Sequence, residues 1–205
     1  GPNIKVGIVR LDTPAVHALG RWRSAPEEGR IRRMSEPSRR LLLLRHSKAE
    51  HVFGKADHER ELTDRGHADA RAIGEWLSAQ GIEPDLVICS TATRTRQTWA
   101  SAQEGGARAD ATAFEKGIYH GGVRAVMTAA QEADPDLTTL LVVGHEPTMS
   151  AATEILTEGA GAAAALAASD RGFPTSGLAV LAVDGPWARL AQGGATLEEF
   201  VVGRG

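Results

Sequence analysis

Three short apolar runs, each followed at once by polar residues, constrain the fold of this 205-residue chain more than any other feature. The runs are Leu41–Leu44, Leu86–Cys89 and Leu140–Val143. Uninterrupted apolar runs of this length are typical of strands buried on both faces of a sheet. Helical periodicity is found over residues 66–80, 94–104, 122–133 and 148–156. This alternation predicts an α/β domain, a three-layer αβα sandwich with a mostly parallel central sheet.

The last part of the chain has a different pattern. Three apolar segments separated by Gly and Pro turns predict further strands at Leu178–Val183, Trp187–Ala191 and Leu197–Val202. The alanine-rich stretch of residues 160–168 is interrupted by glycine and is too short to span a bilayer, so we expect a loop or a short surface helix there.

Residues 1–37 differ in composition from the rest and are interpreted as an N-terminal arm, with the domain proper over residues 38–205. The arm is rich in arginine and has no sustained apolar period, although Ile4–Leu11 could form a strand. Gly1-Pro2 is typical of the scar of a cleaved tag, and Met34 is a second candidate for the native start. The other interpretation is a functional basic arm.

Composition excludes several classes of protein. The net charge of −3 and pI near 6.2 give no sign of nucleic-acid binding. With Cys89 as the one cysteine, neither an internal disulfide nor a multi-cysteine zinc site can form. No apolar stretch approaches the roughly 20 residues of a membrane span, and no signal peptide is recognised. We therefore expect a soluble, cytoplasmic protein that does not act on membranes.

The polar residues after the three runs predict the chemistry. Arg45 and His46 follow the first run, Arg94 comes shortly after the second, and His145 follows the third. Ligands of α/β sheets bind at the carboxyl ends of the strands, so these four side chains should converge. Arginine forks match the oxygens of a phosphoryl group, and a neutral imidazole among them is a competent nucleophile toward phosphorus. Because no carboxylate or cysteine joins them at metal-ligand spacing, we expect neither a metal nor another cofactor.

These residues lie in three of five ordered motifs that together resemble the histidine phosphatase superfamily, also called phosphoglycerate-mutase-like, and within it the short SixA-like phosphohistidine phosphatases. The motifs are Leu44–Ala49, Asp57–Gly66, Cys89–Thr98, Val142–Pro147 and Phe173–Ser176. The resemblance covers about residues 40–203. It implies the phosphoglycerate-mutase-like fold, and the short spacing between Arg94 and His145 leaves no room for the large cap of bigger relatives.

The resemblance also implies a role for each residue. His46 would be the phosphorylated nucleophile, Arg45 and Arg94 would bind phosphate oxygens, and His145 would be the second histidine of the site. Glu115 resembles the family's proton donor, or is a solvated glutamate at the edge of a loop. Two further residues are candidate substrate contacts: Arg60, otherwise a surface ion-pair partner, and Ser47, which departs from the small glycine or alanine usual there.

Three functions are consistent with these residues. The first is a metal-independent phosphatase that acts through a phosphohistidine intermediate on phosphohistidine proteins or small phosphate esters. The second is a sugar-phosphate or nucleotide phosphatase or mutase, although a mutase must shield its intermediate from water in a closed site. The third is an inactive module that binds phosphorylated ligands and has no need of His46. The sequence does not indicate the oligomeric state.

Overall fold

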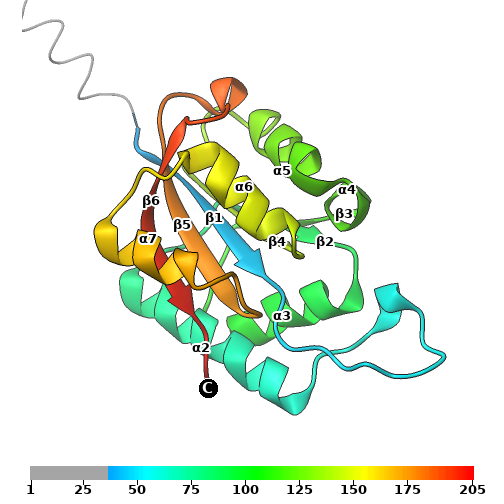
Figure 1. Ribbon diagram of the computed structural model, residues 1–205. Helices are drawn as coiled ribbons and strands as arrows, with labels where there is room; N and C mark the ends of the chain where they lie inside the picture. The colour runs from blue at the N-terminus through cyan, green and yellow to red at the C-terminus, as the bar shows by residue number, and fades with distance from the viewer. Residues whose placement is uncertain (1–36) are drawn as a thin grey trace, which may run out of the picture. The chain divides into compact units, whose positions relative to one another are not determined.

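The computed structural model describes residues 37–205, so the predicted arm, including the candidate strand Ile4–Leu11 and the alternative start Met34, lies outside the described residues. The described part contains a six-stranded sheet with strand order β3-β2-β4-β1-β5-β6 (Figure 1). The strands are β1 (Arg39–Arg45), β2 (Leu86–Ser90), β3 (Ala111–Glu115), β4 (Thr139–Gly144), β5 (Gly177–Val183) and β6 (Ala195–Val202). Strands β1 to β4 are parallel, and β5 is antiparallel to both of its neighbours. The predicted mostly parallel sheet is confirmed.

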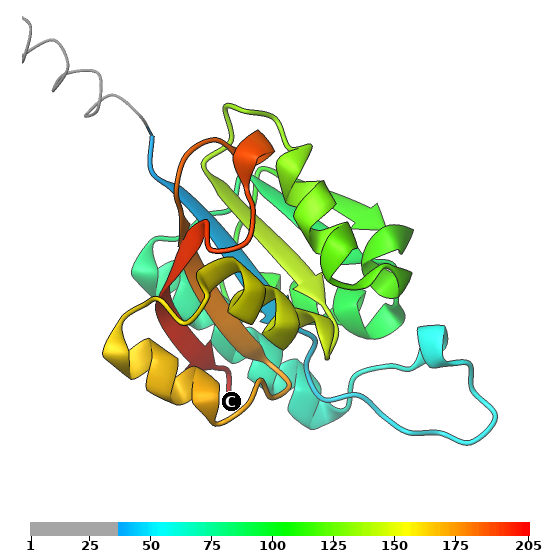
Figure 2. The same cartoon turned by 45° about the horizontal axis from the view of Figure 1, so that its top comes forward.

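Helices cover both faces of the sheet, as predicted (Figure 2). On one face lie α2 (Asp64–Gln80) and α3 (Thr93–Glu104), which pack on Leu42 and Leu44 of β1. On the other face lie α4 (Lys116–His120), α5 (Gly122–Gln131), α6 (Thr148–Thr157) and α7 (Ala163–Asp170), which pack on Leu41 and Leu43. All four leucines are fully buried, because successive side chains of a strand point to opposite faces and both faces are covered.

Two predictions about the end of the chain are settled by side-chain packing. The strand predicted at Trp187–Ala191 is wrong, because Trp187–Arg189 forms a short 3₁₀ helix, η3. Trp187 is buried and donates a hydrogen bond from Nε1 to the Leu137 carbonyl at 2.6 Å, so it anchors a turn and not a strand. The alanine-rich stretch forms the short helix α7, one of the two alternatives.

The start of α2 fixes the loop that follows β1. Thr63 caps this helix by accepting a hydrogen bond from the Gly66 N–H at 3.0 Å. A Cβ at Gly66 would lie 2.1 Å from the Lys48 carbonyl oxygen, so only glycine allows this approach. The residues just after His46 are thus packed directly against the first turn of α2. Within residues 37–205, no helix combines the length and the apolar character needed to cross a membrane.

Candidate active site

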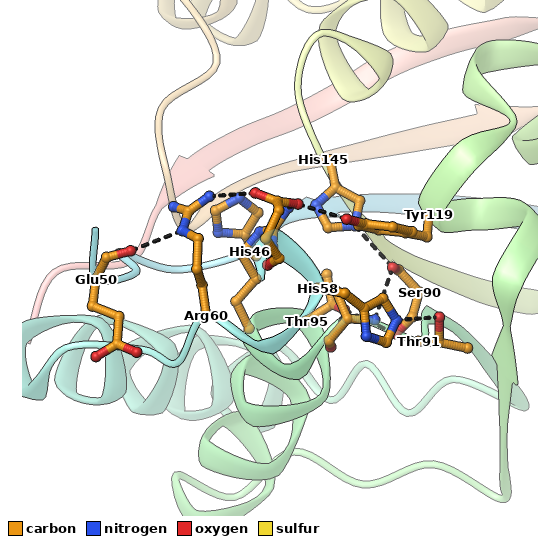
Figure 3. A network of polar contacts seen from close by, with 12 residues as sticks. His46, Glu50, His58, Arg60, Ser90, Thr91, Thr95, Tyr119 and His145 are labelled. Atoms are coloured by element: carbon orange, nitrogen blue, oxygen red, sulfur yellow. Dashed lines mark hydrogen bonds and ion pairs between the residues drawn. The ribbon is translucent and has the colours of Figure 1, made fainter. Parts of the chain in front are cut away.

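The carboxyl ends of β1, β4 and β2 lie side by side and bring the predicted residues together. Strand β4 lies between the other two in the sheet. The His46 N–H continues the pairing of β1 with β4 by donating to the Gly144 carbonyl at 3.0 Å. As a result, the imidazole rings of His46 and His145 are 5.4 Å apart, centre to centre (Figure 3). Arg94 reaches the same region from the first turn of α3.

His46 is held as a neutral imidazole in one orientation. Its Nδ1 lies 2.7 Å from the Ser47 carbonyl oxygen. Because a carbonyl only accepts hydrogen bonds, Nδ1 must carry the hydrogen, which leaves a lone pair on Nε2. Burial, together with the charges of Arg94 and Arg45, lowers the pKa of His46 to about 3, although the contact with Ser47 acts in the opposite direction. The His46 residue is only 8% exposed. At neutral pH its Nε2 is therefore available as a nucleophile.

Ser47 fixes the backbone next to His46 through contacts of its N–H and its hydroxyl. Its backbone N–H donates to the Thr98 hydroxyl at 2.9 Å, and that hydroxyl donates to the Arg94 carbonyl at 2.7 Å. The Ser47 hydroxyl is fully buried and pairs with the hydroxyl of Ser176. These contacts explain physically why Thr98 and Ser176 accompany the Arg-His motif in the sequence.

His145 is oriented by Ser90. The Nε2 atom of His145 lies 2.8 Å from the Ser90 hydroxyl oxygen, which also accepts a hydrogen bond from the Ala92 N–H at 3.3 Å. Within residues 37–205 the Ser90 hydroxyl has no other acceptor for its hydrogen, so we assign that hydrogen to the bond with His145 Nε2, which leaves the hydrogen of the imidazole on Nδ1. Burial and the charge of Arg94 lower the pKa of His145 to about 4. Both histidines are therefore neutral near pH 7.

The two predicted arginines are each anchored by a backbone carbonyl. Arg94 is 6% exposed and donates from Nη1 to the Asp57 carbonyl at 2.7 Å. Arg45 donates from Nη1 to the Phe173 carbonyl at 2.9 Å, and its burial lowers the pKa of its guanidinium. Each arginine thus donates one hydrogen bond to a backbone carbonyl, which fixes the position of its guanidinium group.

Asp57 belongs with the cluster formed by Arg45, His46, Arg94 and His145, although the sequence indicates no role for it. Its carboxylate accepts hydrogen bonds from the Tyr119 hydroxyl at 2.6 Å, Arg60 at 2.8 Å and Arg94 at 3.1 Å. The hydrogen bond from Tyr119, followed by those from the arginines, holds the pKa of Asp57 well below its usual range. The spacing of Asp57 and Arg60, three residues apart, is the sequence feature that could have predicted their ion pair. Tyr119, the one tyrosine of the chain, has no such feature.

Arg60 is placed at the edge of this cluster, as Figure 3 shows beside His46. It is held there by Asp57 and by the Glu50 carbonyl, to which its Nε donates at 2.8 Å. Its side chain is 18% exposed. The loop histidine His58 contacts Thr91 at 2.8 Å and the edge of the Tyr119 ring.

Glu115 lies opposite Ser90 in the pairing of β3 with β2, and Ser90 is the residue that contacts His145. It ends β3, its side chain is exposed, and it lines a groove between β3 and α5. Over residues 37–205, no hydrogen bond or ion pair joins the Glu115 carboxylate to the histidines or to Arg45 and Arg94. In the same range, no group of three or more His, Cys, Asp or Glu side chains is arranged to hold a metal ion.

Unsatisfied polar atoms are concentrated at the cluster. In the described part of the chain, five buried side-chain nitrogens have no hydrogen-bond partner, and three of them are Arg45 Nε, Arg94 Nε and His145 Nδ1. A buried donor without a partner costs about 1–3 kcal/mol, so three of them in one place indicate a site built to bind an acceptor. A phosphoryl group supplies three acceptor oxygens with negative charge.

Comparisons with known proteins agree with this arrangement. The model of the histidine phosphatase superfamily (branch 1) matches residues 41–113. An uncharacterised protein of Mycobacterium tuberculosis is 43% identical over 162 residues, which are 78% of this chain and all of the relative. Two solved structures named for the phosphohistidine phosphatase SixA also match. The protein from Nakamurella multipartitia is 34% identical, with a TM-score of 0.69 over 82% of this chain and 98% of that one. The protein from Agrobacterium tumefaciens is 32% identical, with a TM-score of 0.65 over 82% and 99%.

Proposed function

The chain belongs to the histidine phosphatase superfamily and is a phosphatase, and we propose that it removes the phosphoryl group from phosphohistidine on proteins through an intermediate on His46. The observation that carries this proposal is the set of three unpartnered donors, on Arg45, Arg94 and His145, around a neutral imidazole. The donors suit the oxygens of a phosphoryl group, and the imidazole suits its phosphorus.

The first step is transfer of the phosphoryl group to His46. The lone pair of Nε2 attacks phosphorus while the bond from phosphorus to the substrate nitrogen breaks. The substrate imidazole, protonated on its other nitrogen, takes the electron pair and leaves neutral. Arg45, Arg94 and His145 donate to the phosphoryl oxygens, where charge accumulates in the transition state.

The second step is hydrolysis of the intermediate. Water attacks phosphorus, and the bond from phosphorus to His46 Nε2 breaks, so the electron pair returns to the ring. The water proton leaves with inorganic phosphate or passes to solvent. Because burial keeps the pKa of His46 low, the neutral imidazole is a good leaving group and is restored for the next cycle.

The carboxylates around the site favour phosphohistidine over a phosphate ester. An ester oxygen needs a proton from a general acid as it leaves. Asp57 is held ionised by Tyr119 and two arginines, and Glu146 accepts hydrogen bonds from the backbone and hydroxyl of Ser150. Glu115 is exposed, and within residues 37–205 its carboxylate forms no ion pair with the arginines of the cluster. A leaving imidazole already carries its proton, so this site suits a phosphohistidine substrate better than a phosphate ester.

The absence of an inserted cap favours a protein substrate. Between α3 and β4 the chain forms β3, α4 and α5, and these elements extend the sheet or pack against it. Tyr119 of α4 lies beside His145, with the ring centres 5.5 Å apart, and in the described range this segment contains no helix or strand besides these three. A phosphohistidine on the surface of a folded protein can therefore reach the two histidines.

The test is hydrolysis of para-nitrophenyl phosphate and of a phosphohistidine protein without added metal. Wild type should release phosphate from both and prefer the protein, while His46→Ala should lose at least 10³-fold in rate on both. His51→Ala changes an exposed histidine outside the cluster and serves as the control, with full activity expected on para-nitrophenyl phosphate. Activity retained by His46→Ala would refute the intermediate, and an inactive wild type would refute the proposed function.

A further inference from the structure

Residues 50–61 form a loop of defined shape between β1 and α2. Its ends are joined by a bridge between Ala49 and Leu62 and by a hydrogen bond from the Glu50 N–H to the Glu61 carbonyl at 2.9 Å. Lys55 pairs with the carboxylates of both Glu50 and Glu61 and ties the two sides together. Figures 1 and 2 both show the loop extending away from the sheet and its helices. Compact loops closed at their base in this way are frequently functional.

The tip of this loop is apolar and exposed. The relative exposure of Phe53 is 105% and that of Val52 is 50%. Elsewhere in residues 37–205 only three large apolar side chains are exposed, and none of them has a second one beside it in sequence. One of these, Phe114, lies against the Arg96 guanidinium at 4.2 Å. Single exposed apolar residues are ordinary, but an adjacent pair on a structured tip is a surface for a partner.

The same loop carries part of the candidate active site. Asp57, His58 and Arg60 lie in it, and Asp57 contacts Arg94. Phe53 is seven residues beyond His46, which limits their separation to roughly 25 Å even for an extended chain. A folded protein is wider than this distance, so a protein that covers the tip can also reach the histidines. A permanent partner there would block the site, whereas a substrate protein would be positioned by it.

We propose that Val52 and Phe53 form a docking surface for the folded protein that carries the phosphohistidine, and that they contact an apolar patch beside its phosphorylated residue. The inference rests on the proposed function and adds how a protein substrate is selected. Docking at the tip contributes binding energy that a small phosphate compound cannot obtain, so the loop favours protein substrates.

The test compares Phe53→Ser with wild type on two substrates. One is the phosphohistidine form of a bacterial phosphocarrier domain, a small folded protein, and the other is para-nitrophenyl phosphate. The variant should lose about tenfold or more in kcat/KM on the phosphoprotein, mainly through KM, because a phenylalanine side chain no longer becomes buried on binding. On para-nitrophenyl phosphate it should match wild type within about twofold. Phe53→Leu keeps an apolar tip and should retain most of the activity.

Ile155→Ser is the matched control, because Ile155 is 38% exposed on α6, outside the loop. It should change neither rate. The inference is overturned if Phe53→Ser leaves the phosphoprotein rate unchanged, if it lowers both rates equally, or if wild type hydrolyses the small substrate alone. A wild type that is inactive on both substrates refutes the proposed function itself, so the two failures are distinguishable.

Discussion

Replacing Asp57 with asparagine should tighten the binding of phosphate. The Asp57 carboxylate contacts Arg60 and Arg94, the charges that a phosphoryl group would also use. Its side chain is 54% exposed, so each ion pair is worth roughly 0.2–1 kcal/mol. Phosphate must displace two such ion pairs to bind both arginines, which costs about 0.4–2 kcal/mol. Since 1.36 kcal/mol is a factor of ten, Asp57→Asn should lower the inhibition constant of inorganic phosphate about 2- to 30-fold.

The assay is competitive inhibition of para-nitrophenyl phosphate hydrolysis by inorganic phosphate at pH 7. Asparagine keeps the size of the side chain and an oxygen that can accept from Tyr119. Glu50→Gln is the control, because it removes the same charge from the same loop but the Glu50 carboxylate pairs with Lys55. The inhibition constant of phosphate for the Glu50→Gln variant should change less than twofold. Weaker phosphate binding in Asp57→Asn would refute the competition argument and would mean that the carboxylate positions Arg94 for the substrate.

Three further predictions follow from single contacts. Gly66→Ala should lower the free energy of unfolding in urea by about 1–3 kcal/mol or more, because its Cβ would lie 2.1 Å from the Lys48 carbonyl oxygen; unchanged stability would contradict this packing. Ser90→Ala should lower kcat about 2- to 10-fold with little change in KM, because His145 loses the hydroxyl that orients it; an unchanged kcat would argue against that role. The pKa values of His46 and His145 in the folded protein lie below the value near 6.5 of the unfolded chain, so the folded state binds fewer protons between these values. The free energy of unfolding should therefore be highest above pH 6.5 and fall by a few kcal/mol as the pH approaches 4. NMR should show both imidazole rings neutral at pH 5.

The parts of the structure that could be predicted from sequence are those with a strong burial signal. Residues 41–44, 87, 89 and 140–143 have no measurable exposure, and only a strand covered on both faces requires such a run. Polar residues directly after those runs must lie at one edge of a parallel sheet, which is why His46, Arg45 and His145 could be placed together. Arg94 followed because it opens the helix after β2.

The elements that could not be predicted from the sequence are short or mostly exposed to solvent. Strand β3 lies at the sheet edge and is exposed along most of its length, so Ala111–Glu115 shows no apolar run. Helix α4 has five residues, too few for a helical period, yet it carries Tyr119 into the site. The role of Glu115 stays open between the family's proton donor and a solvated glutamate, and its side chain is exposed in the groove beside α5.

The charge balance of the cluster explains why Asp57 belongs to it. Burial keeps His46 and His145 neutral, while the guanidinium groups of Arg45, Arg60 and Arg94 stay charged. Three cations close together repel one another, and among residues 37–205 the only carboxylate that contacts two of them is that of Asp57. A phosphoryl dianion provides more charge and more acceptors than one carboxylate, so it can replace Asp57 at the arginines. Because Asp57 and the apolar tip lie in one loop, we expect substrate docking and the release of Asp57 from Arg94 to be coupled.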